Sequence, residues 1–163
     1  MRTIDDLLAT NARFVKDFPA RHLAVRPSRR LAVVACMDSR LDVFGALGLG
    51  LGEAHVIRNA GGIVSDDVIR SLAISQRRLG TEDIILIQHT DCGMLTITDD
   101  GFRRELQEAT GIAPGFAIES FTDLEANVGQ SLERLRNSPF VAYRERIRGF
   151  IYDVDTGALR EIT

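Results

Sequence analysis

The segment LAVVAC at residues 31–36 is apolar at every position, and IILIQ at residues 84–88 forms a second such run that ends in one glutamine. Strands of this kind are typical of parallel sheets, because both faces of those sheets are buried. Stretches with helical periodicity lie between the predicted strands. The sequence therefore predicts an α/β fold with a mostly parallel central sheet and helices on both of its faces.

Capping residues and turns set the boundaries of the other elements. Ser65 precedes one predicted helix and Gly80 follows it, whereas Thr122 and Glu125 form a capping box at the start of another. The predicted helices cover residues 3–17, 66–79, 98–110 and 122–136, and the predicted strands cover 31–36, 54–58, 84–88, 149–154 and 158–162. The last two strands flank a hairpin-like turn.

Composition narrows the classes of protein to which the chain can belong. It has 163 residues, of which 45% are hydrophobic and 26% charged, and its net charge is -3. This length fits one domain, residues 1–163. The charge pattern offers no basic stripe for nucleic acid and no polybasic patch for a membrane. Asp5 and Asp6 stand where a signal peptide would be apolar, so we expect a soluble, cytoplasmic protein.

Both cysteines of the protein lie at the ends of the apolar strands. Cys36 ends the first strand, His89 directly follows the second, and Cys92 is one tight turn further on. If these strands are neighbours, about 4.8 Å apart, the three side chains can converge on one zinc ion. Two thiolates and an imidazole leave the fourth position of a tetrahedral zinc open, as catalytic sites require. A disulfide is disfavoured in a reducing cytosol.

Three motifs occur in order along the chain. They are C-x-D-x-R at residues 36–40, HVIRNAGG at residues 55–62 and H-x-x-C-G at residues 89–93. Together they resemble the beta-class carbonic anhydrases, in particular the short bacterial and archaeal branch. The resemblance implies a zinc enzyme that interconverts carbon dioxide and bicarbonate. It rests on residues 31–93, more than a third of the chain.

The same resemblance implies an assembly and a second state of the site. In that family an N-terminal helix, here residues 3–17, embraces a partner subunit, and the active site lies at the dimer interface. We therefore expect a homodimer or a tetramer of dimers.

In some members of that family the aspartate that corresponds to Asp38 turns onto zinc as a fourth ligand and closes the site. Arg40 opposes that movement.

Asp38 and Arg40 have a chemical role that the residue types themselves suggest. A carboxylate beside the metal can accept a hydrogen bond from zinc-bound hydroxide, which leaves a lone pair directed at the carbon of the substrate. Arg40 can hold Asp38 ionised through a two-pronged contact. In extended backbone, residues 38 and 40 face the same side. We therefore expect both to be catalytic residues.

Two other functions use the same ligands. Zinc hydroxide could attack carbonyl sulfide or carbon disulfide, which are linear molecules with an electrophilic carbon like carbon dioxide. Alternatively, the chain could be a zinc-stabilised or bicarbonate-binding module without turnover. Intact Asp38 and Arg40 argue against that module, because a structural zinc favours a fourth protein ligand.

Four further residues lie close to the motifs. His55 falls within a predicted strand, where a structural role is favoured over a role as a proton relay. Asp91 lies between two predicted ligands and could accept a hydrogen bond from one of them. Arg58 and Asn59 are expected to brace the site rather than to react.

The proposed ligand set predicts how activity depends on pH. Two thiolates cancel the two positive charges of zinc, whereas three neutral histidines leave them in place, so the pKa of bound water should be lowered less here. We expect carbon dioxide hydration to rise with pH through the mildly alkaline range. Stopped-flow pH–rate profiles measure this, and a profile flat from about pH 6 to about pH 9 would contradict it.

Overall fold

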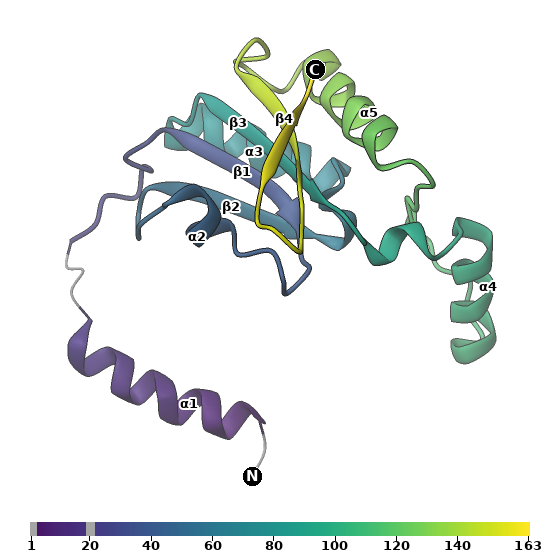
Figure 1. Cartoon of the computed structure of the whole chain (residues 1–163), viewed down its shortest axis with the longest axis horizontal. Coiled ribbons are helices and arrows are strands. Elements are labelled where there is room, and N and C mark those ends of the chain that lie inside the picture. Colours follow the sequence, from purple (N-terminus) through teal and green to yellow (C-terminus); the bar gives the residue numbers. More distant parts are fainter. Residues whose placement is uncertain (1–2, 19–21) are drawn as a thin grey trace.

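The computed structural model describes residues 3–18 and 22–163. A five-stranded sheet with the order β2-β1-β3-β4-β5 forms its centre (Figure 1). The strands are β1 (Leu31–Cys36), β2 (Ala54–Asn59), β3 (Asp83–His89), β4 (Ile147–Tyr152) and β5 (Leu159–Ile162). The first four are parallel, and β5 pairs antiparallel with β4. The predicted fold class is confirmed, although β4 begins two residues before the predicted strand.

The helices follow the predicted order, with differences at their ends and one additional short helix. They are α1 (Thr3–Phe14), α2 (Val43–Leu47), α3 (Asp66–Leu79), α4 (Asp99–Thr110) and α5 (Leu124–Asn137). The predicted helix 3–17 ends as a 3-10 turn over Val15–Asp17. The short helix α2 was not predicted.

The predicted start of α5 was wrong by one residue. Asp123, not Thr122, is the N-cap, because its carboxylate accepts the N–H of Ala126 at 3.0 Å. Both residue types cap helices well. The later start places Leu124 as the first helical residue, where it packs against the buried core.

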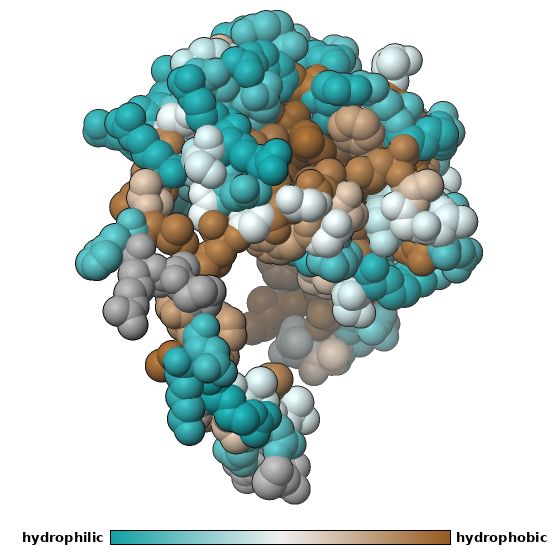
Figure 2. Space-filling model, turned by 60° about the vertical axis from the view of Figure 1, so that its left-hand side comes forward, coloured by the Kyte–Doolittle hydropathy of each residue, from teal (hydrophilic) through white to brown (hydrophobic). Residues whose placement is uncertain are grey.

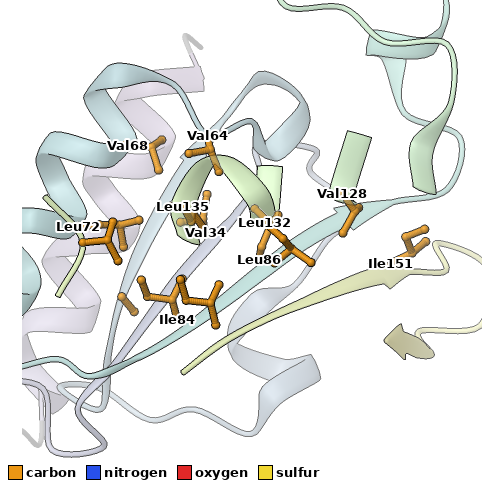
Figure 3. Close-up of a cluster of buried hydrophobic side chains, with 13 residues drawn as sticks. Val34, Val64, Val68, Leu72, Ile84, Leu86, Val128, Leu132, Leu135 and Ile151 are labelled. Atoms are coloured by element: carbon orange, nitrogen blue, oxygen red, sulfur yellow. The ribbon is translucent and has the colours of Figure 1, made fainter. Parts of the chain in front are cut away.

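Alternate residues of the strands enter two separate cores. On one face Val34, Ile84 and Leu86 pack against α3 and α5 (Figure 3). The helical side chains in that core are Val68, Leu72, Val128, Leu132 and Leu135. On the other face, strand residues such as Val33 and Ile87 pack against α2 and the loops. Each fully buried aliphatic side chain contributes about 1.5–3 kcal/mol, so both cores hold the sheet in place.

Helix α1 lies apart from both cores and buries none of its residues (Figure 1). Its apolar residues Ile4, Leu7, Leu8 and Phe14 are all more than half exposed. Figure 2 shows apolar atoms on this arm and a further apolar area on the body above it. Packing of α1 on a partner subunit stays a prediction. Among the described residues, no helix is long and apolar enough to cross a membrane.

The turn after β2 crosses closely over the ends of β1 and β3. Gly62 has a φ of +63°, and a Cβ atom there would lie 2.8 Å from the backbone nitrogen of Cys36 and 2.9 Å from the backbone oxygen of Ile87. Only glycine combines that backbone conformation with that approach. This turn therefore fixes the position of Cys36.

Replacing this glycine tests the close approach. We expect Gly62→Ala to lower the free energy of unfolding by about 2–4 kcal/mol, from left-handed strain plus backbone overlap. Gly111→Ala is the matched control. Gly111 has a φ of +76°, but no atom lies within 4 Å of the position that a Cβ atom would take, so backbone strain alone should lower the free energy of unfolding by about 1–2 kcal/mol. Urea unfolding measures both, and equal losses would contradict the argument.

Candidate metal centre

Three side chains meet at the carboxyl edge of the sheet. Cys36 ends β1, His89 ends the neighbouring strand β3, and Cys92 lies in the turn that follows. The sulfur atoms of the two cysteines and a ring nitrogen of His89 all lie within 4.8 Å of one another, and all three residues are buried. The structure thus brings the three predicted ligands together in the way that parallel neighbouring strands require.

One ring nitrogen of His89 forms a hydrogen bond, and the other forms none within the described residues. Its Nδ1 lies 2.8 Å from the carbonyl oxygen of Thr90, and a carbonyl only accepts, so Nδ1 carries the proton. Nε2 then presents a lone pair toward the cysteines. This buried atom has no hydrogen-bond partner among the described residues. Such an atom costs about 1–3 kcal/mol unless something binds it, and a metal ion fits the need.

The contact between the two cysteines favours a thiolate at Cys36 and a thiol at Cys92. The contact with Cys92 lowers the pKa of Cys36 against the opposing effect of burial, with help from His89 and the N–H of Asp38. The same contact raises the pKa of Cys92. A divalent cation placed between the sulfurs would displace that proton and take both as thiolates. Both cysteines are free of disulfides.

Asp38 stands ionised beside this cluster. Arg40 donates from Nε to Oδ1 at 3.0 Å and from Nη2 to Oδ2 at 2.8 Å, and its backbone N–H also bonds Oδ1. These contacts hold the pKa of Asp38 well below its usual range. Asp38 Oδ2 is 3.7 Å from His89 Nε2. A charged carboxylate is therefore close to any ion that the three ligands hold.

Asp91 contacts Arg40 rather than a predicted ligand. Its Oδ2 accepts from Arg40 Nη1 at 2.7 Å, and its carbonyl oxygen accepts from Nη2 at 2.9 Å. The sequence placed Asp91 beside His89 and Cys92, but the residue has a φ of +54° and its side chain contacts Arg40 in the segment after β1. The spacing alone does not reveal this contact.

Two residues of the central motif brace the backbone as expected. Arg58 donates to the carbonyl oxygen of Cys36 at 2.9 Å and to that of Asp38 at 2.7 Å. Asn59 exchanges two hydrogen bonds with the backbone of Ile63, both 2.8 Å long. Together they fix both turns that border the cluster.

His55 lies away from the cluster. In the register of β1 and β2 it stands opposite Ala32, whereas Asn59 stands opposite Cys36, a difference of about 13 Å along the strand. Its Nδ1 is 2.7 Å from the hydroxyl of Ser75, which is buried. This placement favours the structural interpretation of His55.

A sequence model of the carbonic anhydrase family matches residues 31–159 of the chain. Beta-carbonic anhydrase 1 of Mycobacterium tuberculosis is 55% identical over 163 residues, which cover 100% of this chain and 99% of that protein. The chain belongs to the beta-carbonic anhydrase family. The enzyme class predicted from the three motifs is thereby confirmed.

Two further relatives support the fold and show that the family includes an enzyme named for a second substrate. The crystal structure of carbonic anhydrase from Streptococcus mutans superposes with a TM-score of 0.93 at 44% identity and covers 100% of this chain and 99% of that one. A carbon disulfide hydrolase of Acidithiobacillus thiooxidans is 36% identical over 86% of this chain and 80% of its own length. This beta-carbonic anhydrase therefore has relatives named for two substrates.

The metal-binding role of the cluster can be tested without activity. We expect His89→Asn, Cys36→Ser and Cys92→Ser each to weaken metal binding at least about 100-fold, because each removes a direct ligand. Elemental analysis after dialysis should find one metal ion per wild-type chain and almost none in these variants. His22→Asn changes an exposed histidine and should keep the metal. Metal retained by the His89 variant would exclude that residue as a ligand.

Proposed function

We propose that this enzyme catalyses the zinc-dependent, reversible hydration of carbon dioxide to bicarbonate and a proton. The observation that carries the proposal is the buried cluster of Cys36, His89 and Cys92 with an ionised carboxylate beside it. Two sulfurs and one imidazole nitrogen are a donor set that zinc favours. When bound, zinc makes water acidic enough to act as a nucleophile near neutral pH.

Asp38 acts as the acceptor that orients this nucleophile. Because Arg40 keeps its pKa low, the carboxylate of Asp38 stays charged throughout the neutral range and cannot donate a proton. It would therefore accept a hydrogen bond from the nucleophile and leave a lone pair of that nucleophile free to attack carbon. Arg40 contacts Asp38 through two side-chain hydrogen bonds, which fix the direction of the carboxylate.

The same aspartate can serve as a fourth zinc ligand in a closed state. Its Oδ2 already lies near His89 Nε2, so Asp38 could reach an ion that the three ligands would hold. In that state Asp38 would replace the nucleophile, and catalysis would stop. The contacts with Arg40 oppose the rotation, and they favour the open, active arrangement.

A second candidate function is hydrolysis of carbon disulfide or carbonyl sulfide at the same site. The relatives that are named carbon disulfide hydrolases favour it, at 36% identity. The relative that is 55% identical is named a carbonic anhydrase, so carbon dioxide remains the first choice. A non-catalytic zinc or bicarbonate-binding module is disfavoured, because it would not need an ionised Asp38 beside an open ligand position.

We further propose a single catalytic domain, residues 1–163, that assembles as a homodimer or a tetramer of dimers. The exposed apolar residues of α1 support this assembly, since a surface of that kind is covered in most stable proteins. The cytoplasm is the proposed location, because both thiols must stay reduced to bind zinc.

If Asp38 orients the nucleophile without being needed to hold the metal, its replacement should lower activity and leave the metal content unchanged. Asp38→Ala should keep zinc by elemental analysis but lose about 100-fold in kcat/KM for carbon dioxide, because the orienting acceptor is gone. Stopped-flow assays with carbon dioxide, carbonyl sulfide and carbon disulfide measure the loss and rank the substrates. Asp100→Ala removes an exposed acid of α4 and serves as the control. A fully active Asp38 variant would remove this residue from the mechanism.

A further inference from the structure

Arg40 is shared between two carboxylates, Asp38 in the segment after β1 and Asp91 in the turn after β3. Its Nε bonds Asp38, its Nη1 bonds Asp91, and its Nη2 reaches a carboxylate oxygen of Asp38 and the carbonyl oxygen of Asp91. A guanidinium has five N–H groups in a fixed plane, so both partners are satisfied at once. Asp91 does not compete with Asp38 for this cation; it occupies the opposite edge.

Asp91 is a fixed anchor although its side chain is 77% exposed. The preceding residue, Thr90, donates its backbone N–H to Tyr152 at 2.9 Å, and its hydroxyl accepts the N–H of Val154 at 3.1 Å. These bonds tie the turn to the end of β4. Arg40, in contrast, has a side chain that is 44% exposed, so its direction depends on its hydrogen bonds rather than on packing.

We propose that Asp91 is a positioning residue that holds Arg40 in the plane needed to grip both oxygens of Asp38, and thereby keeps Asp38 off the metal. The inference rests on the proposed function and deepens it. Asp38 Oδ2 lies 3.7 Å from the free nitrogen of His89, so little movement separates its two positions. Without the carboxylate of Asp91, Nη1 of Arg40 loses its partner, and the closed arrangement gains population.

Asp91→Asn is the variant that isolates this role. Asparagine has the same size, tolerates the φ of +54° and leaves the backbone carbonyl contact in place, but it removes the charge. Asp67→Asn is the matched control. It breaks the Asp67–Arg70 pair of α3, which is 2.8 Å long against 2.7 Å for Asp91–Arg40 and whose aspartate side chain is 71% exposed. Both variants lose one exposed ion pair.

Thiocyanate binding to the cobalt-substituted protein reports whether the fourth position is open. The anion occupies that position and changes the visible absorption of cobalt. We expect Asp91→Asn to weaken thiocyanate binding by up to about three- to fivefold, the upper limit set by the loss of one exposed ion pair, and to lower kcat/KM by a similar factor. The Asp67 variant should match the wild type in both measurements, and both variants should melt within a few degrees of it.

Two results would overturn the inference. Thiocyanate affinity and kcat/KM that are unchanged in Asp91→Asn would mean that Arg40 needs no second anchor. A lower melting temperature with unchanged thiocyanate affinity would mean that Asp91 only stabilises the fold. Failure of the proposed function is a separate outcome, since it would show as a wild-type protein that does not hydrate carbon dioxide at any pH.

Discussion

The adjacency of β1 and β3 in a parallel sheet is the constraint on which the site depends. Parallel neighbours bring their carboxyl ends to the same edge, so Cys36 and His89 meet although they are far apart in sequence. The tight turn that follows returns Cys92 to the same place. An antiparallel pairing of the same two strands would have put the cysteine and the histidine at opposite edges, and no metal cluster would exist.

Charge balance is the second physical requirement of the site. The site gathers two thiols and two carboxylates at one edge of the sheet, and in a low-dielectric setting such groups repel one another once ionised. Arg40 stands between the carboxylates of Asp38 and Asp91 and contacts both. A divalent cation bound at the cluster would do the same for the sulfurs. Each pair of anionic groups would then have its own cation.

The sequence predicted the elements that are set by local patterns, and it missed those that depend on tertiary contacts. The apolar runs identified the strands of the parallel sheet, and their last residues identified the three clustered side chains. Helix α2 has five residues and depends on a cap from Asp42, so it left no periodic signal. The contact between Asp91 and Arg40 joins the segments that follow β3 and β1 and depends on the left-handed backbone of Asp91, and no spacing rule encodes it.

Two arginines, Arg58 and Arg40, hold different parts of the site in place. Arg58 bonds the backbone oxygens of Cys36 and Asp38, whereas Arg40 bonds the carboxylate of Asp38. The first contact fixes where the ligand-bearing chain runs, and the second fixes only where one side chain points. The carboxylate can therefore change direction while the cysteine keeps its place. A movable group beside rigid ligands is what a site needs if it is to open and close without releasing its metal.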